Sequence, residues 1–250
     1  GPGAADRPRG ETWEYDGTRW ERIPVVGPSP RSGACMVYDS HRGVTVLFGG
    51  WTGVGSSERA DDTWEWDGTT WTRVATTGPP PRSAAAMAYD SARQVAVLWG
   101  GYGDETTGEW ELNDTWEWDG ASWTERAVEG PGARIWAVMT YDAARGECVL
   151  LGGYVYGQPG TWTWHGEAWT QRAAYWGAPQ SCITYDAVRQ RVVYEYQGGT
   201  FGWSIREWDC QSWSAPVSGP PGWQELRHGA AVFDSQRSRS VLFVPSSSRG

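Results

Sequence analysis

The feature that most constrains this 250-residue chain is an internal repeat. The string Thr-Trp-Glu-Trp-Asp-Gly-x-x-Trp occurs intact at 63–71 and 115–123, and variants of it occupy 12–20, 161–169 and 205–213. A second string, Tyr-Asp-x-x-Arg followed by an apolar run and usually Gly-Gly, alternates with the first. Its copies begin at Tyr38, Tyr89, Tyr141, Tyr185 and Phe233. Five copies of each string predict five structural units with a period near 50 residues.

Each unit carries four strand signals. The runs ACMVYD and VTVLF are joined by an Asp-x-x-Arg turn, and TWEWD is joined by an Asp-Gly hairpin signal to the segment around the closing Trp. No stretch keeps a helical period for more than about two turns. The chain is therefore predicted to be all-β: a five-bladed β-propeller with four antiparallel strands per blade.

Composition narrows the choice of partner. The chain contains 20 Trp, no Lys and a net charge of −9. Without a continuous basic face, we expect neither nucleic acid nor an anionic membrane surface as a partner. No apolar run reaches the roughly 20 residues that span a bilayer, so we expect a soluble globular protein. No signal peptide is visible, and we therefore favour the cytoplasm as its location.

The cysteines and histidines indicate neither a disulfide nor a metal centre. The four cysteines, at 35, 148, 182 and 210, have no metal-ligand spacing, and only three histidines are present. We therefore expect four reduced thiols, no metal and no cofactor.

The repeat resembles the kelch family. The residues that carry the resemblance are the apolar run ending in Gly-Gly, the Trp at fixed spacing after it, and the Pro-Arg-Ser that precedes the first strand at 30–32 and 81–83. The resemblance covers about 11–244, which predicts one propeller domain between a short flexible N-terminus (1–10, beginning with Gly-Pro-Gly, as after protease cleavage) and a tail (245–250). Kelch propellers usually have six or seven blades, whereas this chain supplies five.

The two ends of the chain are complementary. Residues 11–21 carry only two outer strands and 227–244 carry only two inner ones. We therefore expect them to pair and complete the fifth blade, although a fragment of a larger propeller would also fit the count. Deletion of residues 1–22 should remove the two outer strands of this blade and expose strand edges, which would cause aggregation or loss of the fold.

Residues present in every blade are most simply structural. Trp64, Trp66 and Trp71 and their counterparts are expected to fill the wedge between blades. Each Asp of the Asp-x-x-Arg turn is expected to cap its own turn and pair with the Arg, as in Asp39 and Arg42. The Gly-Gly pairs are expected to be bends, because no helix follows them to cradle a phosphate.

Candidate binding residues lie where the inner strands begin. The kelch resemblance implies an arginine cluster at one mouth of the channel, made of Arg31, Arg82, Arg134 and Arg227. Five residues before each Tyr or Phe stand Gly33, Ala84, Trp136, Gln180 and His228. Small residues in two blades and large ones in three would form a lopsided pocket, unless they merely plug the channel.

Further candidates break the repeat elsewhere. Glu195 interrupts an apolar inner strand, where it could face an arginine, act as an acid or base, or reach solvent at a strand end. Aromatic residues on the loops are expected to contact a ligand or fold over the top. These aromatic residues are Trp51, Tyr102, Trp110, Tyr154, Tyr156, Phe201 and Trp203. Trp51, Trp110, Tyr154 and Trp203 are the ones assigned to ligand binding.

Two functions remain open. The first is a monomeric binding module whose mouth grips a small anionic or aromatic molecule, or a peptide segment, through arginines and aromatic rings. The second is a metal-independent isomerase, lyase or cyclase that uses His228 and Glu195 for acid–base chemistry. The kelch-like enzymes with copper or iron need ligand sets that three scattered histidines do not supply.

Overall fold

A computed structural model shows a chain built entirely of strands and turns in the part that it describes. The described residues are 10–53, 58–103, 110–155, 160–175, 177–178, 181–197, 203–218, 230–234, 237 and 239–243. Within them, no helix is long and apolar enough to cross a membrane. The prediction of an all-β chain is confirmed.

Four blades are complete antiparallel sheets, each made of four consecutive strands. The first has β3 (Cys35–Asp39), β4 (Val44–Phe48), β5 (Thr63–Trp66) and β6 (Trp71–Ala75). The second has β7 (Ala86–Asp90), β8 (Val95–Tyr102), β9 (Glu111–Trp118) and β10 (Trp123–Arg126). The third has β11 (Arg134–Asp142), β12 (Glu147–Val155), β13 (Thr161–Trp164) and β14 (Trp169–Ala173). The fourth has β15 (Cys182–Asp186), β16 (Arg191–Gln197), β17 (Trp203–Trp208) and β18 (Val217–Ser218).

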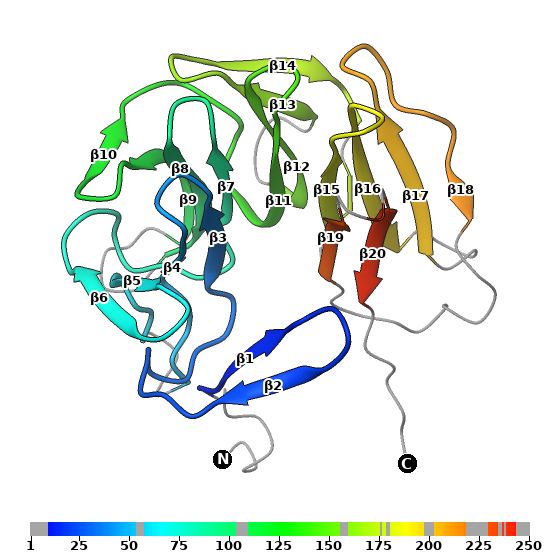
Figure 1. The fold of residues 1–250 in the computed structure, drawn as a ribbon. Helices are drawn as coiled ribbons and strands as arrows, with labels where there is room; N and C mark the ends of the chain where they lie inside the picture. The colour runs from blue at the N-terminus through cyan, green and yellow to red at the C-terminus, as the bar shows by residue number, and fades with distance from the viewer. Residues whose placement is uncertain are drawn as a thin grey trace.

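The blades are arranged around a central axis (Figure 1). The first strand of each blade is innermost, and β3, β7, β11 and β15 contact one another in that order. The strand β19 (Ala230–Asp234) follows β15 as the fifth inner strand and pairs with β20 (Arg239–Phe243). Five inner strands agree with the five units that the repeat predicted.

The fifth blade differs from the prediction. The N-terminal hairpin, β1 (Thr12–Tyr15) and β2 (Trp20–Ile23), and the pair β19–β20 are two separate two-stranded sheets, and no ladder joins β20 to β1 in the described residues. In the described residues the expected ladder between the chain ends is therefore not formed, although each half packs on the blade next to it in the ring. β19 contacts β15, while the hairpin bonds to the first blade.

The aromatic residues of the N-terminal hairpin are about half exposed to solvent, unlike their counterparts in the complete blades. Trp13, Tyr15 and Trp20 are 49%, 53% and 64% exposed, whereas Trp66 in the same repeat position as Tyr15 is 7% exposed. Figure 1 shows this hairpin lying across the gap between the first blade and β20.

Tryptophans join each blade to the preceding one, as the repeat predicted. The closing Trp donates its indole N–H to the first Thr of the previous blade's outer strand, with Trp123 Nε1 2.8 Å from Thr63 Oγ1. Trp169 and Trp213 repeat the bond with Thr115 and Thr161. A buried indole thus keeps its hydrogen bond while its ring fills the wedge between sheets.

The Asp-x-x-Arg turns are also as predicted. Asp39 Oδ1 accepts hydrogen bonds from the backbone N–H groups of His41 and Arg42, and its Oδ2 lies 2.7 Å from Arg42 Nε. The arginine then reaches Glu65 of the same blade at 2.6 Å. These arginines are therefore turn residues and not a binding ring.

Candidate functional site

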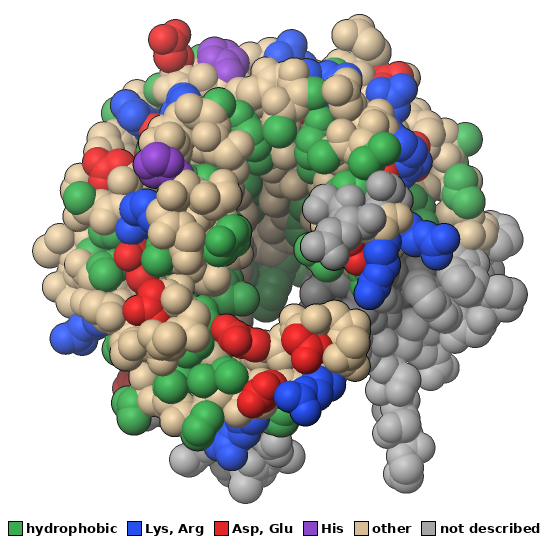
Figure 2. Space-filling view, viewed as in Figure 1, with side chains coloured by type: hydrophobic (Ala, Val, Ile, Leu, Met, Phe, Trp, Pro, Cys, Tyr) green, Lys and Arg blue, Asp and Glu red, His purple; other side chains and the backbone are tan. Residues whose placement is uncertain are grey.

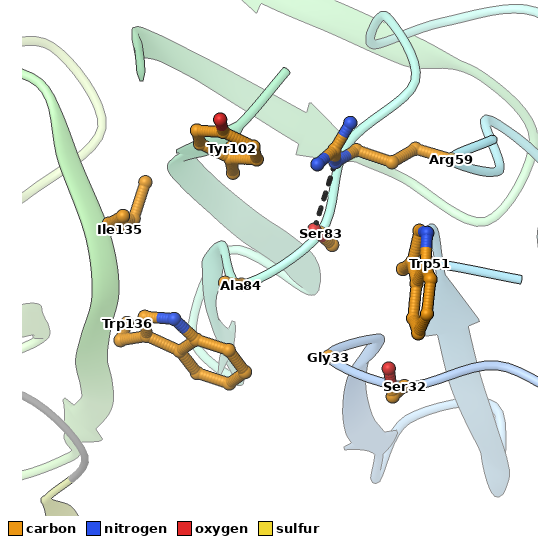
Figure 3. A pocket seen from close by; sticks show the side chains of 9 residues that line it. All are labelled: Ser32, Gly33, Trp51, Arg59, Ser83, Ala84, Tyr102, Ile135 and Trp136. Carbon is orange, nitrogen blue, oxygen red and sulfur yellow. Dashed lines mark hydrogen bonds between the residues drawn. The ribbon is translucent and has the colours of Figure 1, made fainter. Parts of the chain in front are cut away.

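A cavity of about 420 Å³ lies where the inner strands of the first three blades begin. We call it the mouth cavity. It is lined by Ser32, Gly33, Trp51, Arg59, Ser83, Ala84, Tyr102, Ile135 and Trp136. The segments that precede β3 and β7, the start of β11 and the residues that follow Gly-Gly in the first two blades therefore share one face of the ring, as expected. Figure 3 shows the rings of Trp51, Tyr102 and Trp136 surrounding this opening.

The cavity floor is held by backbone hydrogen bonds between neighbouring blades. The N–H of Ala84 donates to the carbonyl of Gly33 at 2.8 Å, and the N–H of Trp136 donates to that of Ala84 at 2.9 Å. All three residues have positive φ, of 63° for Gly33, 55° for Ala84 and 60° for Trp136. This conformation suits glycine and strains a large side chain.

Trp136 is therefore held in a costly conformation beside a cavity. Its side chain is 37% exposed and lines the wall that the sequence assigned to it. Strained residues often mark functional sites, because a protein retains them where the strained side chain is used.

Arg59 is the basic group of the mouth cavity. Its guanidinium carbon lies 4.4 Å from the centre of the Tyr102 ring, and its Nε donates to Ser83 Oγ at 3.2 Å. The second blade thus fixes a side chain from the loop of the first blade, and Figure 3 shows the guanidinium between Tyr102 and Trp51.

The predicted arginine cluster at the mouth is wrong for the arginines that the structure describes. The side chains of Arg31 and Arg82 are 6% and 1% exposed, and Arg134 is fully buried. Arg82 Nη1 donates to the carbonyl of Gly100 at 2.9 Å, and its two Nη atoms lie 2.6 and 2.7 Å from the Asp114 carboxylate. These side chains turn into their own blades, where they satisfy the carbonyls of the Gly-Gly bends, and none of them lines the mouth cavity.

The third blade modifies this arrangement. Gly160 stands where the other two blades have Asp62 and Asp114, and Arg134 Nη1 donates to the carbonyls of Gly152 at 3.5 Å and of Gly160 at 3.3 Å. Burial lowers the pKa of Arg134 to about 10.

The other predicted site residues divide into three groups. Trp51 lines the mouth cavity, and Trp110 packs on its rim, with ring centres of Trp110 and Tyr102 5.6 Å apart. Tyr154 is 48% exposed and pairs in register with Ile135 of the cavity wall. Gln180, Arg227 and His228 lie outside the described residues, as does the side chain of Trp203.

Glu195 lies apart from the mouth cavity. It is 3% exposed within β16, where the first three blades have Phe48, Trp99 and Leu151, and its Oε2 has no hydrogen-bond partner among the described residues. The expected arginine partner is absent from the described residues around it, and burial raises the pKa of Glu195 to about 7. Glu195 does not line the mouth cavity.

The central channel forms a separate space of about 280 Å³. Alanines, methionines and the thiols of Cys35 and Cys182 contribute to its wall. All four cysteines of the chain are free, and burial raises the pKa of Cys35 and of Cys182 to about 12, so these thiols are not nucleophiles near neutral pH. Figure 2 shows the hydrophobic wall of the central hollow.

Comparisons with known proteins identify the fold. No protein-family model and no curated protein sequence matches the chain. The solved structure of YjhT is similar over 84% of this chain and 71% of its own, with a TM-score of 0.61 and 15% sequence identity. The fold is a β-propeller. At this identity the likeness concerns the fold alone, and the chemistry has to be argued from the residues of the mouth cavity.

Sequence reasoning missed four residues of this β-propeller's cavity. They are Ser32, Arg59, Ser83 and Ile135, of which Arg59 carries the charge. One signal could have found it. In the register that aligns Asp62 with Asp114, Arg59 falls opposite Glu111, so this arginine does not belong to the repeat.

Proposed function

We propose that this protein is a binding module whose mouth cavity takes a small molecule consisting of a flat ring and a carboxylate. The observation that carries the proposal is the meeting of three aromatic side chains, from three blades, with one guanidinium around about 420 Å³. That volume lies within the roughly 300–1,000 Å³ of ligand pockets.

The chemistry of the lining supports this ligand class. Indole and phenol rings stack on aromatic or sugar rings, and a guanidinium pairs with a carboxylate through parallel hydrogen bonds. Contacts with Ser83 and Tyr102 orient Arg59 before a ligand arrives, which reduces the entropy lost on binding.

Binding is favoured over catalysis because Glu195, the acid–base candidate that the structure describes, is not part of this cavity. Glu195 lies in β16 and does not line it. We also propose that the repeats are of the kelch type, on the strength of the Gly-Gly, Trp and Pro-Arg-Ser pattern.

Replacing Trp136 with Gly should weaken binding without weakening the fold. Glycine adopts a positive φ without strain, so the free energy of unfolding should stay within about 1 kcal/mol of that of the unmodified protein or rise. Loss of a ring that anchors the ligand should weaken binding by about thirtyfold, near 2 kcal/mol. Isothermal titration with N-acetyltryptophan and with glucuronate measures affinity, and chemical denaturation measures stability.

Ala84→Gly is the matched control, because it relieves the same backbone conformation and removes no aromatic wall. It should leave the affinity unchanged within about twofold. If neither probe binds the unmodified protein at millimolar concentration, or if Trp136→Gly binds as well as the control, the proposed function is wrong.

A further inference from the structure

A second cavity adjoins the mouth cavity. It has a volume of about 320 Å³ and lies between the N-terminal hairpin and the first blade. We call it the seam cavity. Its apolar wall is made by Ala34, Met36, Leu47 and Trp71. Gly33 lines both cavities, so the two spaces are neighbours at this residue.

The seam cavity exists because one sheet face lacks its neighbour. Met36 is 63% exposed, whereas Met87 and Met139, two residues before the Tyr of the next two blades, are 8% and 7% exposed. Those blades are covered by an adjacent inner sheet, whereas among the described residues the pair β19–β20 packs mainly on β15 and leaves Met36 of β3 exposed. The seam cavity therefore offers apolar surface that the fold does not use.

Gly33 keeps the junction open. A Cβ at this position would lie 3.3 Å from the backbone nitrogen of Ala84 and 3.5 Å from Trp136 Cη2. A methyl group would therefore stand between the two cavities, against the indole that forms the mouth wall.

Charge excludes a second anionic group from the seam cavity. The guanidinium of Arg31 is held at 2.6 Å by Asp62 and is not available to a ligand carboxylate. Glu11 also lines the cavity and would repel an anion. The part of a ligand that enters here should therefore be uncharged and apolar.

We propose that the mouth and seam cavities form one two-part site for N-acylated aromatic amino acids. The aromatic ring and the carboxylate occupy the mouth cavity, beside Trp136 and Arg59. The acyl chain passes Gly33 and lies along Met36 and Leu47. This inference rests on the proposed function, because the mouth cavity has to bind the ring and the carboxylate first.

Titration with N-acetyltryptophan and N-hexanoyltryptophan tests the second part alone. The two probes share ring and carboxylate and differ by four methylene groups. If the longer chain is partly buried in the seam cavity, N-hexanoyltryptophan should bind about tenfold more tightly. Equal affinity of the two probes would overturn the two-part site while leaving the proposed function intact. Failure of both would overturn both.

Two variants locate the acyl chain. Met36→Asp should remove most of the tenfold gain and leave the affinity for N-acetyltryptophan within about twofold. The matched control is Val217→Asp, which changes a residue of equal exposure, 63%, on β18, and should keep the full gain.

Gly33→Ala should also remove the gain, and Ala84 shows that the fold accepts alanine in this conformation. A gain that survives both Met36→Asp and Gly33→Ala would place the chain elsewhere and overturn the proposal.

Discussion

Replacing Arg82 with Ala should lower the free energy of unfolding by about 3–5 kcal/mol, the largest stability change that we expect in this chain. The substitution removes a guanidinium that is 1% exposed and leaves the Asp114 carboxylate without its bidentate partner. Burial alone would raise the pKa of Asp114, but hydrogen bonds from Arg82 hold it below its ordinary value. A carboxylate that was stabilised as an anion becomes a buried charge without an ion-pair partner.

Urea denaturation at neutral pH measures the effect. The control is Arg59→Ala, which should leave the unfolding free energy within about 1 kcal/mol while weakening the binding of ring carboxylates at least tenfold. The two arginines thus separate a structural role from a binding role. Equal stability of Arg82→Ala and the unmodified protein would show that the ion pair does not contribute to the fold.

The fold could be predicted because its determinants recur. A Trp that must fill a wedge and donate one N–H leaves the same signature at Trp71, Trp123 and Trp169, and an Asp that caps its own turn leaves another. Repetition turns a weak local signal into a strong one. The number of blades and the strands of each blade follow from it.

The fifth blade could not be predicted in detail, because pairing across the chain ends depends on packing and not on pattern. The strings at 12–20 and 233–244 are adequate strands, but sequence does not reveal that β19 stays on β15 while the hairpin follows the first blade. The seam cavity could not be predicted either, because the sequence does not reveal that Met36 is exposed where Met87 and Met139 are buried.

The mouth cavity was predicted in part. Gly33, Ala84 and Trp136 were placed correctly, because a fixed distance from the repeat Tyr fixes their place around the axis. The direction of a long side chain is not fixed in this way. Arg82 and Arg31 begin beside the mouth and turn into the blade, while Arg59 begins on a loop and reaches the mouth.

Glu195 should make the protein less stable as the pH rises from about 4.5 to about 7. Burial raises the pKa of this carboxyl from 4.5 to about 7 in the folded protein. Between these values the folded state keeps the proton that the unfolded chain has released, so folding becomes harder as the pH rises. The stability present below pH 4.5 should fall by about 3 kcal/mol and level off above pH 7.

Glu195→Gln should remove this loss, because an amide does not ionise. The variant should match the unmodified protein at pH 4.5 and be more stable by about 3 kcal/mol at pH 8, as measured by denaturation at both values. Glu125→Gln, on the exposed strand β10, is the control and should change neither. This pH dependence arises because Glu195 occupies a buried position where the first three blades have Phe48, Trp99 and Leu151. Its Oε2 accepts no hydrogen bond from the described residues. A difference between variant and unmodified protein that is the same at both pH values would mean that Glu195 is ionised in the fold and has a partner there.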